Sequence, residues 1–155
     1  MLSMKAKYAL KALTALTLSD GGQMSAWAIA SEANVPPKFL EAIMTELRMR
    51  GIVNSRRGAA GGFVLARDAR QIMAGDIIRM MDGPLAPIRC ASVTAYQRCE
   101  DCPDEERCTL HDMMKDVRSA LSSVLDHRSI HDLAHTEGKK AVKPGKKTKN
   151  IKTRS

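Results

Sequence analysis

The sequence has few aromatic residues and no long apolar run. Aromatic side chains make up 3% of its 155 residues, which is few for a β-sandwich, so a core of Leu, Ile, Val, Ala and Met favours a mainly helical fold. Because no run of about 18 apolar residues is present, we expect no membrane-spanning helix. Lys11 interrupts the only apolar stretch near the start that resembles a signal peptide. We therefore expect a cytoplasmic protein, whose thiols remain reduced.

Charge is distributed unevenly along the chain. Residues 1–89 hold 12 Lys or Arg against 7 Asp or Glu, residues 90–136 hold 5 against 9, and residues 137–155 hold 8 against 1, within a total formal charge of +8. Such a basic balance favours a polyanionic partner, which is either nucleic acid or an anionic membrane surface. We expect residues 136–155 to form a disordered basic tail, because they lack large apolar side chains.

Residues 1–83 have the pattern of a winged helix-turn-helix domain. Apolar residues at helical spacing predict a helix in the first 19 residues, a second helix capped by Ser25, and a third over 37–50. The third helix should bury Phe39, Ile43 and Leu47 on one face. Two β-prone runs joined by a glycine-rich turn predict a hairpin over 52–65, and a further helix should span 74–82.

This domain predicts DNA binding, since the polar face of the third helix fits a major groove. Arg56 and Arg57 in the hairpin are placed to contact phosphates or a minor groove. The alternative is an ordinary amphipathic surface helix beside an ordinary hairpin. The candidate DNA-binding residues are Lys5, Tyr8, Ser25, Lys38, Glu41, Thr45, Arg48, Arg56, Arg57 and Gly58.

The second half of the chain combines a cysteine-rich loop with a long helix. Residues 84–108 have no clean periodicity, and a helix should follow from about Leu110 to Arg128, started by Thr109 with Asp112. Ser129 should cap a last turn through Leu133. Apolar residues of the long helix step by four and three, which is typical of a coiled-coil seam; they are Leu110, Met114, Val117, Leu121 and Val124.

The four cysteines are Cys90, Cys99, Cys102 and Cys108, and His111 follows closely. Cysteines so close together in a reduced compartment are better suited to one soft metal or cluster than to disulfides. Cys108 also precedes a helix N-terminus, where a thiolate is favoured. The alternatives are a structural zinc site of four Cys, or inert thiols.

Other candidate sites have simpler interpretations. His127, His131 and His135 should lie on a solvated helix face, and the acidic residues of 100–106 should form a solvated loop. Met44, Met113 and Met114 occupy core-facing helical positions, which argues against a copper site. Because no catalytic triad is present, we expect no enzyme.

Several stretches together resemble the Rrf2 family of bacterial winged-helix regulators, of the iron–sulfur-sensing type. The resemblance covers residues 1–135 and rests on short matches: Lys7-Tyr8-Ala9-Leu10, Phe39-Leu40-Glu41, Leu47-Arg48 with Gly51-Ile52-Val53, and Arg57-Gly58 through Gly61-Gly62-Phe63. In the hairpin over 52–65, which corresponds to the wing of the family, Ala59-Ala60 replaces the more usual Pro-Gly. The resemblance implies that Arg57 enters the minor groove, that Glu41 discriminates bases, and that a homodimer forms on the long helix.

The resemblance also implies a cofactor and a role. A [2Fe–2S] or [4Fe–4S] cluster would be held by Cys90, Cys102 and Cys108, with Cys99 or His111 as fourth ligand; we favour Cys99, because thiolate is the softer ligand. The expected function is that of a sequence-specific DNA-binding repressor whose DNA affinity is set by the cluster, which would sense iron, redox state or nitric oxide. The chain would be organised as DNA-binding domain 1–83, cluster loop 84–108 and dimerisation helix 109–135. The alternatives are a zinc-stabilised or cysteine-redox regulator of the same fold, and a small iron–sulfur electron carrier.

Overall fold

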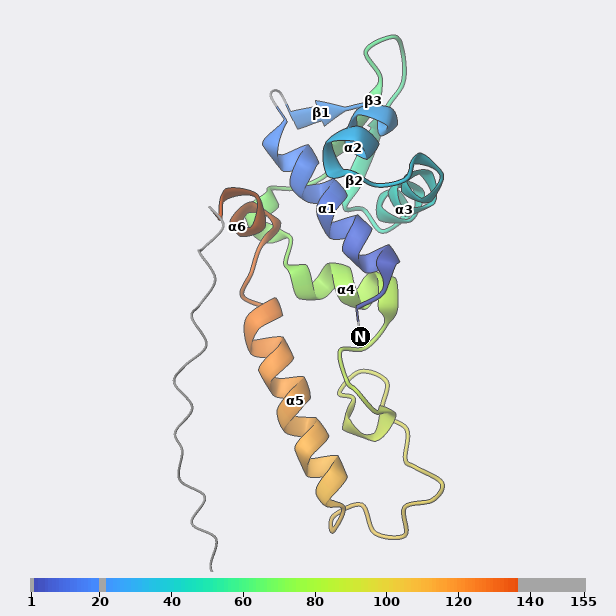
Figure 1. Ribbon diagram of the computed structural model, residues 1–155, viewed down its shortest axis with the longest axis vertical. Helices are drawn as coiled ribbons and strands as arrows, with labels where there is room; N and C mark the ends of the chain where they lie inside the picture. Colours follow the sequence, from blue (N-terminus) through green and yellow to red (C-terminus); the bar gives the residue numbers. More distant parts are fainter. Residues whose placement is uncertain (1, 20–21, 137–155) are drawn as a thin grey trace, which may run out of the picture.

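The computed structural model describes residues 2–19 and 22–136, so the predicted basic tail lies outside the described residues apart from Thr136. Figure 1 shows the first four helices, the sheet and the last helix gathered together, with one long helix and an irregular loop extending away from them. The elements follow the order α1 (Met4–Leu18), β1 (Gln23–Met24), α2 (Ala26–Ala33), α3 (Pro37–Met49), β2 (Val53–Arg56), β3 (Gly62–Leu65), η2 (Ala69–Gln71), α4 (Ala74–Asp82), η3 (Arg89–Ala91), α5 (Thr109–Leu125) and α6 (Ile130–His135).

Helix α1 forms the centre of the core and packs against α2, α3, α4 and α6. Its inner face is rich in alanine, which allows neighbouring helices to approach closely, and Leu13 and Leu16 fill the remaining space. Ser3 and Ser25 cap α1 and α2 by accepting backbone N–H groups of the first turns. Helix α2 ends at Asn34 in the left-handed conformation, and Pro37 starts α3.

The three strands form an antiparallel sheet in the order β1-β3-β2. The hairpin of β2 and β3 pairs Val53 with Leu65 and Arg56 with Gly62, so residues 57–61 form the tip of a wing. Strand β1 was absent from the sequence-based expectation because two residues carry no periodicity. Gly62 permits this strand to pair, since a Cβ at that position would overlap the backbone carbonyl of Met24.

Helix α5 begins and ends differently from the sequence-based expectation. Its N-cap is Cys108, whose Sγ accepts the N–H of His111 at 3.4 Å, and Thr109 is already helical; the prediction that Thr109 caps the helix was wrong. The helix ends at Leu125 rather than Arg128. None of its residues is buried, and Met113, expected to face the core, is exposed. In a single chain, the apolar seam of α5 is therefore exposed to solvent.

The chain returns from α5 to the group of helices α1–α4 through a short backbone bridge. Ala74 N–H donates to the Arg128 carbonyl and Ile130 N–H donates to the Ile72 carbonyl, both at 2.8 Å. Ile130 is fully buried, and Ser129 forms a capping box with Asp132 at the start of α6. The predicted cap at Ser129 is confirmed. It separates His127 from α6, where His131 and His135 stack on one another.

Candidate DNA-binding surface and metal centre

The outer face of α3 is polar and exposed, as predicted. Lys38, Glu41, Thr45 and Arg48 all lie at exposed positions, opposite the buried Leu40, Ile43, Met44 and Leu47. The Arg48 guanidinium donates to the hydroxyl of Ser55 at 3.3 Å and so links α3 to β2. The helix therefore presents a row of hydrogen-bonding groups over three turns, which suits contacts with base edges and phosphates.

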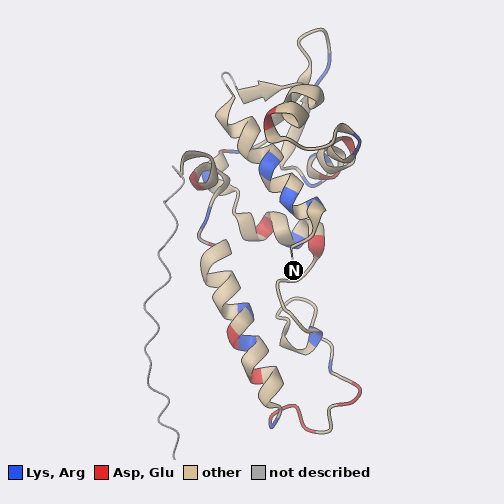
Figure 2. Cartoon of the chain, in the orientation of Figure 1, with Lys and Arg blue, Asp and Glu red and all other residues tan. Residues whose placement is uncertain are grey.

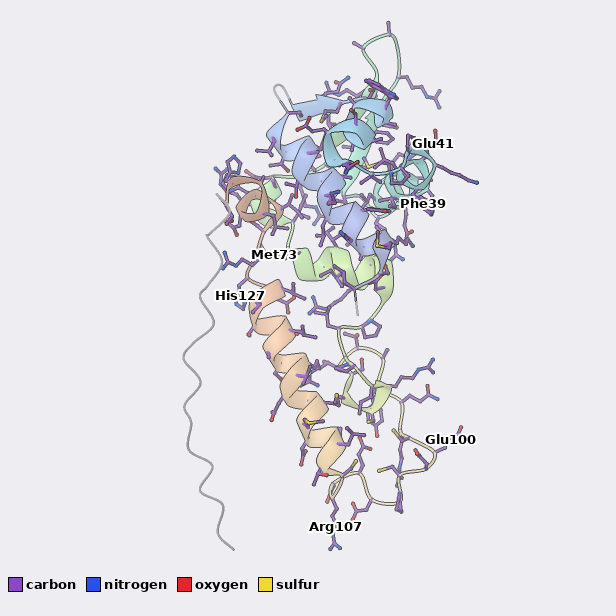
Figure 3. All side chains as sticks on the ribbon, viewed as in Figure 1. Phe39, Glu41, Met73, Glu100, Arg107 and His127 are labelled. Carbon is purple, nitrogen blue, oxygen red and sulfur yellow. The ribbon has the colours of Figure 1, made fainter. Side chains whose placement is uncertain are left out.

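Phe39 is the exception to the core face predicted for α3. Its side chain is 59% exposed, because Phe39 lies about 100° around the helix from Leu40 and so beside the buried face. The ring lies 6.2 Å from that of Tyr8, between ring centroids, and this contact covers only one side of it. Figure 3 labels Phe39 and Glu41 on the same helix, and both are surface residues. The recognition surface thus contains an aromatic group that the sequence pattern had assigned to the core.

The wing projects two arginines and a glycine. Arg56, Arg57 and Gly58 are exposed, and Gly58 has φ +110°, a conformation that favours glycine. The Gln23 side chain contacts both the Arg56 guanidinium and the Ala60 carbonyl, so β1 supports the tip of the wing. In Figure 2 basic residues mark both this hairpin and α1.

The remaining DNA-binding candidates lie on α1 and α2. Lys5 forms an ion pair with Glu46 of α3 at 2.5 Å, which reduces the positive charge available to a phosphate. Tyr8 packs against the core and Phe39. Ser25 is exposed at the N-terminus of α2, where its hydroxyl accepts the Ala28 N–H and the helix dipole favours an anion.

All four cysteines are unpaired thiols, and they influence one another. A hydrogen bond with Cys90, followed by burial, raises the pKa of Cys99. Burial and then a hydrogen bond with Cys108 raise the pKa of Cys102. The thiols thus lie as two neighbouring pairs in one region of the loop. Two such pairs of sulfur donors along one segment offer the ligand type of an iron–sulfur cluster, whose iron atoms would offset the repulsion between thiolates.

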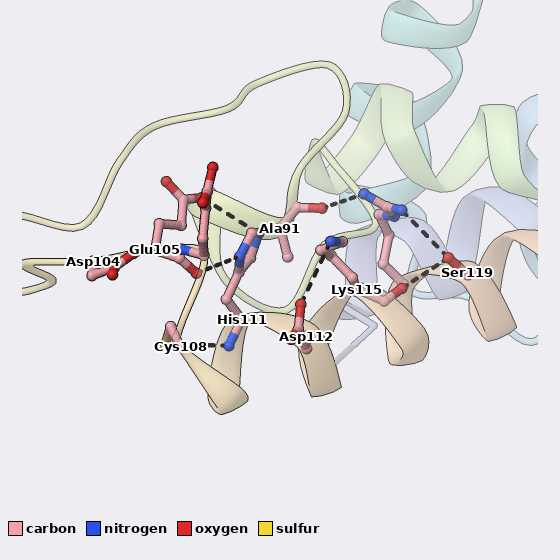
Figure 4. Close-up of polar contacts among 10 residues, drawn as sticks. Ala91, Asp104, Glu105, Cys108, His111, Asp112, Lys115 and Ser119 are labelled. Atoms are coloured by element: carbon pink, nitrogen blue, oxygen red, sulfur yellow. Dashed lines mark hydrogen bonds and ion pairs between the residues drawn. The ribbon is translucent and has the colours of Figure 1, made fainter.

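A second group of donors lies beside the thiols. One ligand atom from each of Cys90, Glu105 and His111 lies within 4.8 Å of the other two. The Glu105 carboxylate accepts a hydrogen bond from the Tyr96 hydroxyl at 2.6 Å, and its other oxygen lies 3.4 Å from Nε2 of His111. Figure 4 shows Glu105 and His111 facing one another above the start of α5.

The placement of Glu105 corrects the expectation of a solvated acidic loop. Its side chain is only 19% exposed, whereas Glu100 and Arg107 lie on the outside of the loop in Figure 3. Sequence spacing gave no sign of this, because Glu105 is one of several acids in a run. Tyr96 was the one available signal: it is the only aromatic residue after Phe63, and it lies in a polar loop.

Comparisons with known proteins identify the family. Residues 2–136 match the family model Rrf2, described as an iron-dependent transcriptional regulator. The chain belongs to the Rrf2 family of transcriptional regulators. It is 36% identical over 139 residues to a putative rrf2-like HTH-type regulator of Rhodobacter capsulatus, covering 86% of this chain and 91% of that protein.

Solved structures agree with this assignment. CymR, the global cysteine regulator of B. subtilis, superposes with a TM-score of 0.69 at 32% identity, covering 86% of this chain and 95% of CymR. IscR of T. potens has a TM-score of 0.67 at 28% identity, covering 86% of this chain and 85% of that one. The winged helix-turn-helix fold is thereby confirmed, and so is a regulatory rather than an enzymatic role. Among the described residues, no helix combines the length and apolar character needed to cross a membrane.

Proposed function

We propose that this Rrf2 regulator is a homodimeric repressor whose affinity for operator DNA is set by an iron–sulfur cluster in the loop 84–108. The observation that carries the proposal is that Cys99 interacts with Cys90 of η3 and Cys102 interacts with Cys108, which is the N-cap of α5. Cys90, Cys102 and Cys108 would bind the cluster, and Cys99 would complete it as a fourth thiolate. When bound, the cluster would supply a redox- and iron-responsive group.

Recognition of DNA would divide between α3 and the wing. Glu41 is suited to accept a hydrogen bond from a cytosine amino group, and Lys38, Thr45 and Arg48 are suited to position the helix on the phosphates. The exposed Phe39 ring adds an apolar contact for a thymine methyl group. Arg57 would enter the minor groove, where a narrow groove attracts a guanidinium.

Contacts at the middle and at the C-terminal end of α5 provide a route from the loop to the DNA-binding domain. At the middle of the helix, Arg118 donates to the Ala91 carbonyl of η3 at 2.7 Å, so the helix holds the segment that carries Cys90. At its far end, Asp126 pairs with Arg79 of α4. A change in the loop would therefore reorient α5 against α4. Binding or loss of the cluster would in this way shift the population of dimers that can bind DNA.

The homodimer would form along the apolar seam of α5. Leu110, Val117, Leu121 and Val124 are each at least 40% exposed in a single chain, although they follow a coiled-coil spacing. Pairing two such helices would remove this stripe from water and would fix the separation of two α3 helices. A palindromic operator follows from that symmetry.

The relatives and the thiol geometry also support a second candidate function. Cys99 lies beside Cys90, and such a neighbouring pair is suited to a reversible disulfide in a cysteine-redox regulator. One of the similar structures is named as a cysteine regulator. A zinc-stabilised loop is the third possibility and would involve the same thiols.

Anaerobic purification separates these functions. The cluster proposal predicts iron and acid-labile sulfide in the isolated protein, with the visible absorption of a cluster, and loss of both in Cys102→Ser and Cys108→Ser. Ser123→Ala on the outer face of α5 serves as a matched control that keeps them. Zinc without sulfide that is lost in Cys102→Ser and Cys108→Ser would support the structural four-cysteine site, and metal-free protein with a reversible Cys90–Cys99 disulfide would support the redox regulator. Either result would overturn the cluster proposal.

A further inference from the structure

We propose that Cys90, Glu105 and His111 form a binding site for a single divalent transition-metal ion, such as Zn²⁺ or Fe²⁺, that requires no sulfide. The proposal extends the function proposed above, because Cys90 belongs to both sets of ligands. The three residues come from separate segments: η3, the loop and the first turn of α5. Their convergence is a property of the fold and not of neighbouring positions in the sequence.

The separation of the donor atoms fits a metal ion better than a direct hydrogen bond. Nε2 of His111 lies 3.4 Å from Oε1 of Glu105, which is long for a charge-assisted hydrogen bond. Two nitrogen or oxygen ligands of a tetrahedral Zn²⁺, each about 2.05 Å from the ion, lie about 3.3 Å apart. The Cys90 sulfur also lies within 4.8 Å of one ligand atom of each of the other two residues.

The surroundings orient the ligands for such an ion. Tyr96 donates to Oε2 of Glu105, which leaves Oε1 directed at His111. Nδ1 of His111 lies 3.4 Å from the Glu105 backbone carbonyl, so a proton on Nδ1 leaves the Nε2 lone pair available. This is the outer-shell arrangement that metal-binding histidines commonly have.

Burial and charge are also appropriate. Cys90 is 6% exposed and the His111 side chain 14% exposed, so the group is sheltered without being closed to entry. One thiolate and one carboxylate together balance the charge of a divalent cation, and imidazole adds a neutral ligand. Mixed sulfur, nitrogen and oxygen donors suit Zn²⁺ and Fe²⁺ rather than Mg²⁺ or Ca²⁺. A fourth position remains for water.

The ion would give the regulator an ordered state without a cluster. It would join η3 and the loop to the first turn of α5, which are the same segments that the cluster would connect. Because Cys90 serves both groups, the ion and the cluster would exclude one another. The supply of metal ions and the supply of sulfide would then act separately on which of the two groups occupies the loop.

Cobalt titration tests the site. Full-length protein that has been reduced and freed of iron and sulfide is titrated anaerobically with Co²⁺, and absorption and helical circular dichroism are recorded together. We expect one Co²⁺ per chain, with the bands of a four-coordinate ion and a thiolate-to-cobalt charge transfer. Cys90→Ser should remove the charge-transfer band. Glu105→Gln and His111→Ala should each weaken binding by tenfold or more, and Tyr96→Phe by less.

Cys102→Ser is the decisive control. It should retain the Co²⁺ site and lose the capacity to assemble a cluster from iron and sulfide. If Cys102→Ser abolishes Co²⁺ binding while Glu105→Gln leaves it unchanged, the ion binds the thiols and the proposed site is wrong. Wild-type protein that binds Co²⁺ through Glu105 but assembles no cluster would instead contradict only the iron–sulfur function. Variants that lose helical circular dichroism are replaced by Glu105→Ala and His111→Gln.

Discussion

Arg79 and Asp126 form a two-pronged ion pair between α4 and the end of α5. Nη1 donates to Oδ1 at 2.7 Å and Nη2 donates to Oδ2 at 2.8 Å. The pair explains a glycine in α4: a Cβ at Gly75 would overlap Oδ1 of Asp126. The ion pair therefore fixes the end of α5 against α4 of the DNA-binding domain. It lies on the route by which we propose that the loop is coupled to this domain.

Breaking this pair should cost stability in a pH-dependent manner. Hydrogen bonds from Arg79 lower the pKa of Asp126. The pair's contribution is therefore complete above the unfolded pKa of about 3.9 and is lost as pH falls through the lower folded pKa. Because both side chains are about one-third exposed, we expect Asp126→Asn to lower the free energy of unfolding by only about 1 kcal/mol at pH 7.

Urea denaturation at several pH values measures this effect. The difference between Asp126→Asn and wild type should shrink below about pH 4. Asp116→Asn, which changes an exposed carboxylate in the middle of α5, should show no comparable difference at neutral pH. A deficit in Asp126→Asn that grows toward acid pH would contradict the assigned role of the pair.

The sequence predicted the elements that have strong local signals. Helix α4 spans 74–82 as expected, since Ile77, Ile78 and Met81 define its face and Gly83 ends it. The hairpin was expected within one or two residues. Phe39 was assigned wrongly because periodicity cannot distinguish the edge of an apolar face from its centre. Thr109 was predicted as the N-cap of α5 instead of Cys108, because Thr-x-x-Asp is the commoner capping signature.

The sequence predicted only those site residues whose chemistry can be inferred from their spacing along the chain. Four cysteines within 19 residues indicate a common centre without any structure. Glu105 could not be distinguished from the neighbouring acids, since its burial depends on Tyr96 and on the path of the loop. Lys5 had no sequence signal for its pairing with Glu46, which is 41 residues away and meets it only through helix packing.

The wing arginine should contribute both affinity and sequence preference. Operators are first selected from random duplexes with the wild-type protein. Arg57→Ala should weaken binding to the selected operator by about 1 kcal/mol or more and should broaden the preference at adjacent A·T steps. Lys38→Ala should weaken all duplexes about equally and reduce the salt dependence. Unchanged operator affinity in Arg57→Ala would show that the wing does not contact the groove.

The exposed Phe39 ring should contact a thymine methyl group. Replacing one thymine of the operator at a time by uracil removes only that methyl. At one position the wild type should lose about 0.8 kcal/mol, a three- to fourfold change in affinity. Phe39→Ala should bind thymine and uracil at this position equally well. Equal losses in both proteins would refute the contact.

The seam of α5 should hold the homodimer. Leu121→Asp places a charge in the centre of the apolar stripe and should convert the protein to monomers at micromolar concentration, because the charge would be buried without a partner. Ser123→Asp, on the opposite side of the helix, should leave the dimer intact. Sedimentation velocity distinguishes the two. A dimeric Leu121→Asp protein would require a different interface.

The most direct test of the account is operator affinity with and without the cluster. One anaerobic preparation is divided, half is freed of iron and sulfide, and both halves are titrated against the selected operator at fixed salt. The account predicts at least about tenfold tighter binding by the cluster-loaded half, equivalent to about 1.4 kcal/mol. The difference should disappear in Cys108→Ser. Equal affinity of the two halves, with iron and sulfide confirmed in one of them, would contradict regulation of DNA binding by the cluster.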